Sequence, residues 1–466
     1  MEYRVEHDSM GEVRVPADKY WGAQTERSHN NFPIGVGIET MPAEIVHAFG
    51  ILKKAAARAN RALRPEKMTE EKLAAIEQAA DEVISGQLLD NFPLVVWQTG
   101  SGTQSNMNSN EVIANRGNEI AGRKLLHPND DINMSQSSND TFPTAMHIAA
   151  VCAIEDKVIP AIDTLTATFR RLEEENAGIV KSGRTHLQDA TPISFPQEIS
   201  GWRSSLERDK ELLLLAVKPL KELALGGTAV GTGLNTPKGF DTAVAAEIAK
   251  LTGKDFKTAE NKFHALTSKD ELVYLHGAFK ALAADLMKIA NDVRWLASGP
   301  RDGLGEIFIP ENEPGSSIMP GKVNPVIPEV VNQVAFRVIG NDLTITIASE
   351  AGQLELNVME PIIVYSLFEN IEMLIRSMNT LRDRCVTGIT ANEERCLQYV
   401  HNSIGVVTAL NPYLGYETST ELAKTALRTG KGIYDLVLEQ GLMSREELDS
   451  VLSPENMLRP HKLARR

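Results

Sequence analysis

The segment Gly315–Pro325, which reads GSSIMPGKVNP, gathers residue types that can take a proton from carbon. Gly315 and Gly321 permit unusual backbone angles. A serine in such a loop becomes basic when backbone N–H groups and a nearby lysine stabilise its alkoxide. Lys322 supplies this charge and can also bind a carboxylate, and Asn324 adds a neutral hydrogen bond. The segment predicts proton abstraction next to a carboxylate; the alternative is a mobile surface loop.

Two further polar clusters precede expected helices. The run Thr99–Asn110, TGSGTQSNMNSN, leads into an expected helix at Glu111–Ala121. Its hydroxyls, amides and free N–H groups would meet at a helix N-terminus, where an anion is favoured. A solvated loop is the alternative. The run His127–Thr144, HPNDDINMSQSSNDTFPT, leads into a long helix. Ser138, Asn139 or Asp140 can cap that helix, but the surplus of polar groups suits recognition of a carboxylate by neutral donors.

A fourth cluster, Gly183–Asp189, reads GRTHLQD and contains His186. Histidine titrates nearest neutrality and can move protons. A single histidine is more often a structural or surface residue than a catalytic one, so its spacing alone carries little weight.

The overall charge limits the kinds of partner. The chain has 466 residues and a formal charge of -14, because 62 acidic residues outnumber 48 basic ones. This balance argues against nucleic acid or an anionic membrane as a partner, apart from a small basic stretch at 461–466. The start of the chain has no apolar leader and no run is long enough to cross a bilayer, so we expect a cytoplasmic protein. Three scattered cysteines favour neither a disulfide framework nor a metal site.

Long apolar stripes indicate the elements that position these clusters. Apolar residues recur every three or four positions, and the expected long helices are Ile148–Leu172 with a kink at Pro160, Trp202–Leu223, Asp270–Leu296, Glu329–Ile347 and Val364–Leu381. A short hairpin is expected at Tyr3–Val15. Strands do not alternate with helices, so the chain is mainly α, with a central bundle and a plausible homo-oligomer. Boundaries are expected near Asn139 and near Gly388–Asn392.

In combination these motifs resemble the fumarase/aspartase superfamily of homotetrameric lyases. The signature is GSSIMPGKVNP, and HPNDDINMSQSSND and GRTHLQDA accompany it in the family's order. The resemblance covers essentially the whole chain. It implies a three-domain subunit, with an N-terminal domain at 1–139, a central long-helix bundle at 140–390 and a small C-terminal helical domain at 391–466. The central helices would form the core of a homotetramer, and each active site would be shared by three subunits.

Within the superfamily the chain is most similar to the metal-independent class II fumarases. Gln104, Ser138, Asn261–Phe263 and Glu311–Pro314 carry this similarity. Two segments, at 326–332 and 357–361, look more like aspartase. The resemblance implies reversible hydration of fumarate to (S)-malate, a step of the tricarboxylic acid cycle, through an aci-carboxylate intermediate. The alternative is aspartate ammonia-lyase, which uses the same loop and expels ammonia.

A non-catalytic structural protein on this scaffold, such as the lens crystallins related to one of the family's lyases, is a further alternative. Retention of His186, Ser316, Lys322 and Asn324 together argues against it.

The resemblance also implies a role for individual residues. Ser316 would be the base, and His186, with Glu329 as its charged partner, would help protonate the departing hydroxyl. Lys322 would stabilise the intermediate. The residues implied to bind the substrate or line its pocket are Ser101, Gly102, Thr103, Ser137, Ser138, Asn139, Thr185, Ser317, Lys322 and Asn324. His127, Pro128, Asn129 and Asp130 match a peripheral dicarboxylate site. The reaction demands no metal and no cofactor.

Overall fold

The computed structural model describes residues 2–460; residue 1 and the basic stretch at 461–466 lie outside the described residues. The described chain is mainly helical, as the sequence predicts, and its strands form two-stranded pairs. It divides into two compact units. Unit 1 comprises residues 1–160, 209–283 and 336–375, and unit 2 comprises residues 161–208, 284–335 and 376–466. Within residues 2–460, no helix is long and apolar enough to cross a membrane.

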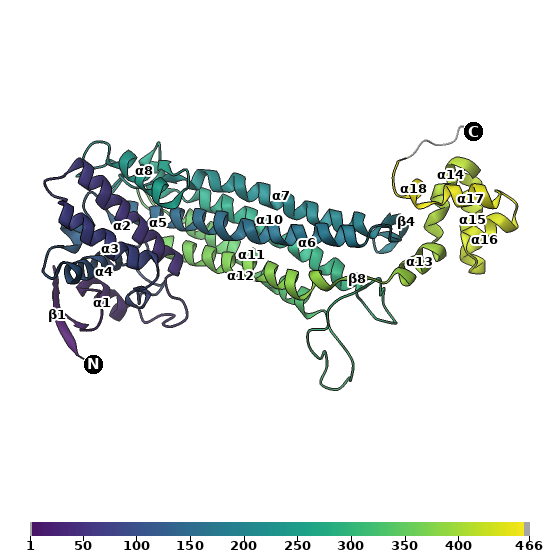
Figure 1. Ribbon diagram of the computed structural model, residues 1–466, viewed down its shortest axis with the longest axis horizontal. Helices are drawn as coiled ribbons and strands as arrows, with labels where there is room; N and C mark the ends of the chain where they lie inside the picture. The colour runs from purple at the N-terminus through teal and green to yellow at the C-terminus, as the bar shows by residue number, and fades with distance from the viewer. Residues whose placement is uncertain (1, 461–466) are drawn as a thin grey trace. The chain divides into compact units, whose positions relative to one another are not determined.

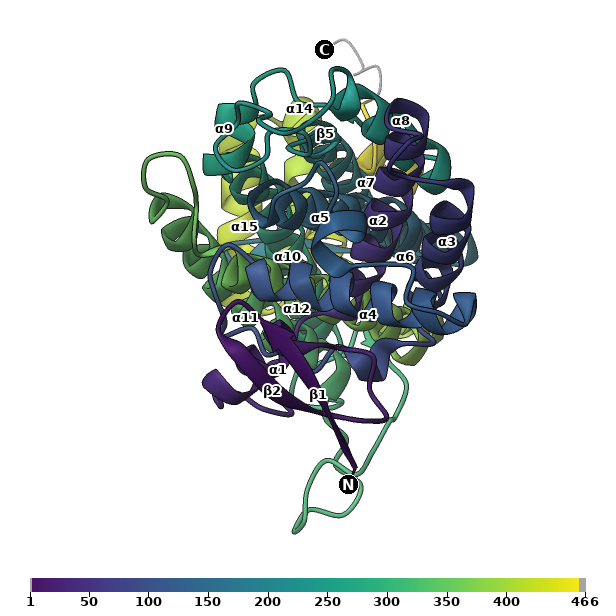
Figure 2. The ribbon, with the colours of Figure 1, turned by 90° about the vertical axis from the view of Figure 1, so that its left-hand side faces the viewer.

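Unit 1 begins with the predicted hairpin. Strands β1 (Tyr3–Asp8) and β2 (Gly11–Pro16) pair antiparallel. The helices that follow are α1 (Ala23–Asn31), α2 (Ala43–Leu63), α3 (Glu70–Ile84), α4 (Thr103–Ala121), α5 (Ser138–Ala153), α8 (Phe240–Thr252) and α9 (Lys262–Thr267). Helix α2 packs against α3, α5 and α8, and α3 packs against α4 (Figure 2). The core that α2, α3 and α4 share is mostly aliphatic and includes Val46, Ile76, Ala79, Val112 and Ile113.

Four long helices contribute residues to both units. They are α7 (Phe195–Leu220), α10 (Asp270–Leu296), α11 (Val326–Glu350) and α12 (Glu360–Arg384). The bounds of α10 coincide with those expected from the sequence. The expected single helix at 148–172 is wrong in one respect. A π-helical turn at Ile154–Val158 separates α5 from α6 (Ile159–Glu175), just before Pro160, which cannot donate a backbone hydrogen bond.

Unit 2 contains the hairpin of β3 (Val180–Thr185) and β4 (Gln188–Ser194) and the short pair β7 (Ile307–Phe308) and β8 (Thr390–Ala391). Its C-terminal helices are α13 (Glu393–Asn402), α14 (Val407–Leu414), α15 (Tyr416–Thr429), α16 (Ile433–Glu439), α17 (Arg445–Val451) and α18 (Pro454–Met457). They share a core with Val180 that includes Leu410, Leu422, Val437 and Leu448. Between α10 and α11 the chain leaves the helices as a long open loop (Figure 1).

The remaining elements are short. In unit 1, β5 (Glu222–Leu223) pairs in parallel with β6 (Lys257–Thr258), and a π-helical turn spans Pro128–Ile132. Single 3-10 turns occur at Leu89–Asn91, Val386–Gly388 and Ile404–Val406.

Candidate active site

The N-terminus of α4 is packed closely against α5. Gly102 precedes the helix with a positive φ of 70°, and a Cβ built on it would lie 2.1 Å from the Phe142 ring. Only glycine permits this approach. Gly102 has no side chain to cap the helix, so the N–H groups of the first turn stay available to an anion. The hydroxyls of Ser101 and Thr103 lie 3.1 Å apart beside them.

Helix α4 begins eight residues earlier than the sequence predicted. The expected start was Glu111, but the helix starts at Thr103, so most of the polar run at 99–110 is helical. The reason is that its amides are buried and bonded: Asn106 and Asn108 are both almost inaccessible to solvent, and Asn108 Nδ2 donates to the Asn91 carbonyl at 2.9 Å.

The N-terminus of α5 is capped by Ser137 and not by the three following residues that the sequence offered. Ser137 Oγ accepts from the Asn139 N–H at 3.3 Å, and Asp140 Oδ1 accepts from the Ser137 N–H at 2.9 Å. Asp140 is fully buried, and its other oxygen accepts from the N–H groups of Gly226 and Thr228. Burial raises the pKa of Asp140 to about 6, and these backbone donors oppose that rise. Because Ser137 is the cap, the hydroxyl of Ser138 is left for other partners.

The two helix N-termini meet at one hydrogen bond. Asn106 Nδ2, in the second turn of α4, donates to Ser138 Oγ at 3.0 Å. Ser138 and Asn139 are half-buried at the first positions of α5, and Asn139 Nδ2 donates to the Ala229 carbonyl at 2.8 Å. Two helix dipoles and several neutral donors therefore face one polar site in unit 1. This arrangement is suited to binding an anion such as a carboxylate.

The candidate acid, His186, occupies the turn of the β3–β4 hairpin in unit 2. Thr185 pairs with Gln188, so His186 and Leu187 form a two-residue turn with φ of 55° and 61°. Positive φ angles at both residues are typical of the two-residue turns whose twist matches that of the flanking strands. His186 and Thr185 are exposed. The turn therefore presents the imidazole outward instead of burying it in a core.

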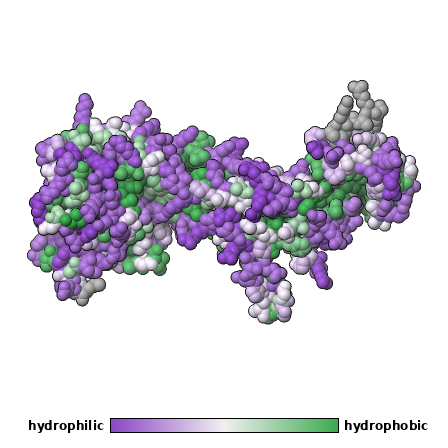
Figure 3. Space-filling model, in the orientation of Figure 1, coloured by the Kyte–Doolittle hydropathy of each residue, from purple (hydrophilic) through white to green (hydrophobic). Residues whose placement is uncertain are grey.

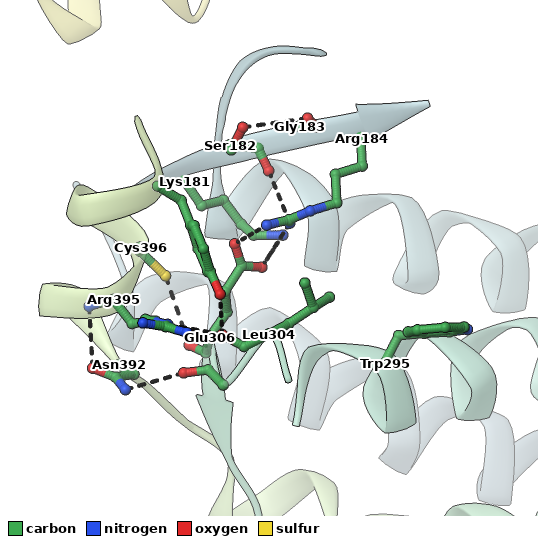
Figure 4. A network of polar contacts seen from close by, with 12 residues as sticks. Lys181, Ser182, Gly183, Arg184, Trp295, Leu304, Glu306, Asn392, Arg395 and Cys396 are labelled. Carbon is green, nitrogen blue, oxygen red and sulfur yellow. Dashed lines mark hydrogen bonds and ion pairs between the residues drawn. The ribbon is translucent and has the colours of Figure 1, made fainter. Parts of the chain in front are cut away.

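The base of this hairpin is held by a buried ion-pair network (Figure 4). The Glu306 side chain is fully buried. Arg184 binds it with two nitrogens at 2.9 and 3.0 Å, and Lys181 Nζ lies 3.1 Å away. Lys181 also pairs with Glu198 at 2.8 Å. Arg184 directly precedes Thr185, so this network fixes where the exposed turn leaves the fold.

The Ser316 loop closes on itself. The Gly315 N–H donates to the Lys322 carbonyl at 2.7 Å, and Asn324 Nδ2 donates to the Gly315 carbonyl at 2.7 Å. Ser316 Oγ accepts from the N–H groups of Ile318 and Met319 at 3.3 and 3.1 Å. Two backbone donors on one hydroxyl oxygen would stabilise an alkoxide there, as the sequence argument requires.

The tip of this loop is open to solvent. Ile318 is 83% exposed, and Ser317 and Lys322 are exposed as well. The loop projects from the molecule, and in Figure 3 the surface at the tip of this projection is pale to green and not purple. These colours agree with exposed apolar side chains. Within residues 2–460 no salt bridge involves Lys322. The side-chain hydrogen bonds of Ser316 and Asn324 thus order the loop internally.

A cavity of about 640 Å³ lies at the foot of the loop in unit 2. Lys322, Asn324 and Glu329 line it, with Arg294 and Trp295 from α10. Glu329 is in the first turn of α11. Among the described residues, no hydrogen bond or ion pair joins His186 to Glu329 or to Ser316. The chain therefore brings Lys322, Asn324 and Glu329 to one cavity but leaves His186 on a separate element.

The predicted peripheral residues form a turn of their own in unit 1. His127 caps the π-helical turn, and its Nδ1 accepts from the N–H groups of Asn129 and Asp130 at 3.3 Å each. With Nδ1 accepting these bonds, the ring proton is on Nε2. Asn129 and Asp130 line a cavity of about 780 Å³ that also receives Arg64, Lys67 and Lys72.

Sequence reasoning missed two buried ionic residues, Glu306 and Lys53. Glu306 belongs to no polar cluster and only the fold reveals it. Lys53 carried a signal, because it falls in phase with the apolar residues Phe49 and Ala56 of α2 and is 1% exposed. An ionisable residue on the apolar face of a helix requires partners.

Comparison with known proteins identifies relatives along the whole chain. The chain matches a lyase family over residues 11–340 and the family described as fumarase C C-terminus over residues 406–459. A class II fumarate hydratase of Bacillus cereus is 56% identical over 99% of this chain and 100% of its own length. One of Campylobacter jejuni is 54% identical with the same coverage. The crystal structure of recombinant class II fumarase from Schistosoma mansoni matches with a TM-score of 0.94 at 40% identity, over 99% of this chain and 100% of that chain.

Proposed function

The chain belongs to the fumarase/aspartase family of lyases, among its class II fumarases, and from this we propose that it interconverts fumarate plus water and (S)-malate. The observation that carries the proposal is full-length identity above one half to class II fumarate hydratases. The polar site at the paired helix N-termini supports the proposal, because the N–H groups and neutral side chains there can bind a carboxylate.

We propose that this polar site holds one substrate carboxylate. Ser138, Asn139 and Thr103 supply neutral donors, with Ser101 and Gly102 lining the pocket beside them. Ser137 would contribute indirectly: its hydroxyl accepts a bond from the Asn139 N–H and so caps the helix that carries Ser138 and Asn139. Thr185 would act from the hairpin turn. These donors orient the substrate and hold its charge while the reacting carbon is exposed to the base.

Proton abstraction is assigned to Ser316. Its alkoxide would take the proton from C3 of malate, leaving an aci-carboxylate with two negative charges on the adjacent carboxyl group. Lys322 and Asn324 would stabilise that charge as it forms, and preorganised donors of this kind contribute about 3 kcal/mol each. Ser317 would bind from the same loop. His186, paired with Glu329, would give a proton to the departing C2 hydroxyl, which leaves as water.

We propose that the active enzyme is a homotetramer in which three subunits supply each site. Helix α11 carries an exposed apolar stripe at Phe336, Ile339, Leu343 and Ile347, with exposures between 37% and 63%. Such a stripe needs a partner surface. A second observation agrees: His186 has no bond to Glu329 or Ser316 among the described residues of one chain. The three free cysteines suit the reducing cytoplasm, where we place the reaction.

The cavity beside Asn129 and Asp130 would take a second dicarboxylate. Its lining carries three cations, Arg64, Lys67 and Lys72, and three acids, Glu66, Asp130 and Asp131. Arg64 pairs with Glu66 and Lys72 with Asp131, so Lys67 is the cation that would attract such an anion. Pro128 starts the turn that carries the two aspartates.

A direct assay tests the assignment. Purified protein receives (S)-malate or L-aspartate as its sole substrate, and the ultraviolet absorbance of fumarate is followed. We expect fumarate to form from malate and not from aspartate. Turnover of aspartate alone would replace the hydratase by the ammonia-lyase, and turnover of neither would favour a structural protein.

A further inference from the structure

We propose that Lys53 is a positioning residue for dicarboxylate binding: it orients the Asn106 amide so that the Ser138 hydroxyl is left free to donate to a substrate carboxylate. The inference rests on the proposed function only in taking Ser138 as a substrate contact. It adds a residue from α2, a helix that none of the sequence motifs includes.

Lys53 is a buried cation surrounded by amide oxygens. Its Nζ lies 2.6 Å from Asn106 Oδ1, 2.8 Å from Gln136 Oε1 and 3.4 Å from Asn133 Oδ1. An ammonium has three N–H donors, and the cage offers three acceptors. No carboxylate lies within 4.0 Å of Lys53 among residues 2–460. The cost of burying this charge is therefore offset by hydrogen bonds to amide oxygens and not by a direct ion pair.

The cation sets the direction of the hydrogen bonds around it. Lys53 can only donate, so Asn106 must turn its oxygen toward Nζ and its NH₂ group the other way. That NH₂ group donates to Ser138 Oγ at 3.0 Å and to Asn133 Oδ1 at 3.1 Å. Ser138 Oγ is thereby an acceptor from inside the protein. Its own hydrogen is left to point outward, toward an acceptor such as a carboxylate oxygen.

The same cation fixes the loop that leads to α5. Gln136 turns its oxygen to Lys53, and its Nε2 donates to the carbonyls of Ile132 and Met134 at 3.0 Å each. Asn133 Nδ2 donates to the Gln136 carbonyl at 3.3 Å. Without the ammonium, Gln136 and Asn133 keep their bonds to backbone carbonyls, but Asn106 loses the group that decides which end of its amide faces inward. The Ser138 hydroxyl could then adopt several orientations instead of one.

The carboxylates described on the neighbouring helices are bonded to other groups, so none of them replaces the amides as a direct partner of Lys53. Asp140 on α5 is the carboxylate whose charge acts on Lys53, and it is held by backbone donors. Glu77 and Asp81 on α3 pair with Arg58 and Lys54, and Glu247 on α8 pairs with Arg58. Burial lowers the pKa of Lys53 to about 7, opposed by the Asp140 charge, so the ammonium form prevails below that pH.

The test compares two adjacent lysines at a pH below 7. Lys53→Met removes the cation and keeps the length of the side chain. Lys54→Met is the matched control, because Lys54 lies next to Lys53 on α2 but pairs with the exposed Asp81 of α3 and, within the described chain, has no bond to the amide cluster. We expect Lys53→Met to raise KM for malate about tenfold, with kcat within about threefold, since a bond made equally in ground and transition states is lost. Binding of succinate, a dicarboxylate that cannot react, should weaken about tenfold as well.

A double-mutant cycle separates positioning from a general structural role. In a Ser138→Ala background, Lys53→Met should change succinate affinity by less than about twofold, because the group it positions is gone. Equal losses in both backgrounds would overturn the proposal. So would an affinity and KM for Lys53→Met within about twofold of the parent.

A second variant serves if Lys53→Met does not fold. Asn106→Asp keeps an acceptor for Lys53 but cannot donate to Ser138, whose hydroxyl must then turn inward. We expect Asn106→Asp to weaken succinate binding when Ser138 is present and to change it much less in the Ser138→Ala background. Equal changes in the two backgrounds would refute the proposal. Succinate binding needs no turnover, so these comparisons stand whether the enzyme proves to act on malate or on aspartate.

Discussion

Two polar segments, both read from the sequence as substrate-binding, are built in opposite ways. At the N-terminus of α5, Ser138 and Asn139 are half-buried and each is bonded to another part of unit 1. In the loop Gly315–Pro325, the side-chain hydrogen bonds of Ser316 and Asn324 stay within the loop, and its tip is exposed.

This difference separates two tasks. Holding a carboxylate requires donors whose direction is fixed before the ligand arrives, and unit 1 fixes them with a buried cation, a capping box and a close glycine contact. Removing a proton requires a base that reaches the substrate and then excludes water. An exposed loop with flexible glycines is suited to such closure. On the proposed function, the carboxylate donors of unit 1 would be in place within the single chain, and the proton-transfer site would be completed by assembly and ligand.

The largest effect should come from the loop. Ser316→Ala removes the base, and we expect kcat to fall by about 10³-fold. Succinate affinity should stay within about twofold, because Ser316 is the proposed base and not one of the proposed carboxylate donors. Steady-state kinetics and calorimetry measure the two quantities, with sedimentation as the control for assembly. A near-normal rate would remove Ser316 from the mechanism.

Two matched glycine substitutions sharpen the comparison. Gly102 and Gly321 have similar positive φ values of 70° and 79°, but a Cβ meets Phe142 at the first and nothing within 4 Å at the second. We expect Gly102→Ala to lower the free energy of unfolding by about 3 kcal/mol or more, since overpacking adds to backbone strain. Gly321→Ala should cost about 1 kcal/mol. Urea titrations measure both, and equal losses would contradict a rigid first region and an open second one.

The smallest effect is a pH dependence. Because the pKa of Lys53 is lowered to about 7, raising the pH through 7 converts its ammonium to the amine, which has one donor fewer. We expect succinate to bind about fivefold more weakly one unit above pH 7 than one unit below it. Lys53→Met should lack this change, and a parallel profile in both proteins would assign it to another group.

The sequence predicted the elements better than their contacts. The segment Asp270–Leu296, expected to be helical, matches the bounds of α10, because a long helix with a buried face is well marked in sequence. The expected start of α4 was wrong, because Asn106 and Asn108 are buried polar residues whose partners lie far along the chain. Composition cannot distinguish such a helix from a loop.

The candidate site shows the same limit. Motifs pointed to Ser138, His186 and Ser316, yet nothing local in the sequence indicated that Lys53 sets the direction of the Ser138 bond. Nor did it indicate that Glu306 holds the hairpin of His186. Such roles depend on tertiary contacts between distant segments, which short-range patterns do not encode.

The most direct test of the difference between the two segments is hydrogen exchange with and without succinate. The N–H groups at the start of α5 should be protected already in the free enzyme, because they are bonded and half-buried. Those of Gly315–Pro325 should exchange rapidly when free and become protected when succinate binds. Equal protection of both segments in the free enzyme, or a loop that succinate leaves unprotected, would contradict the account.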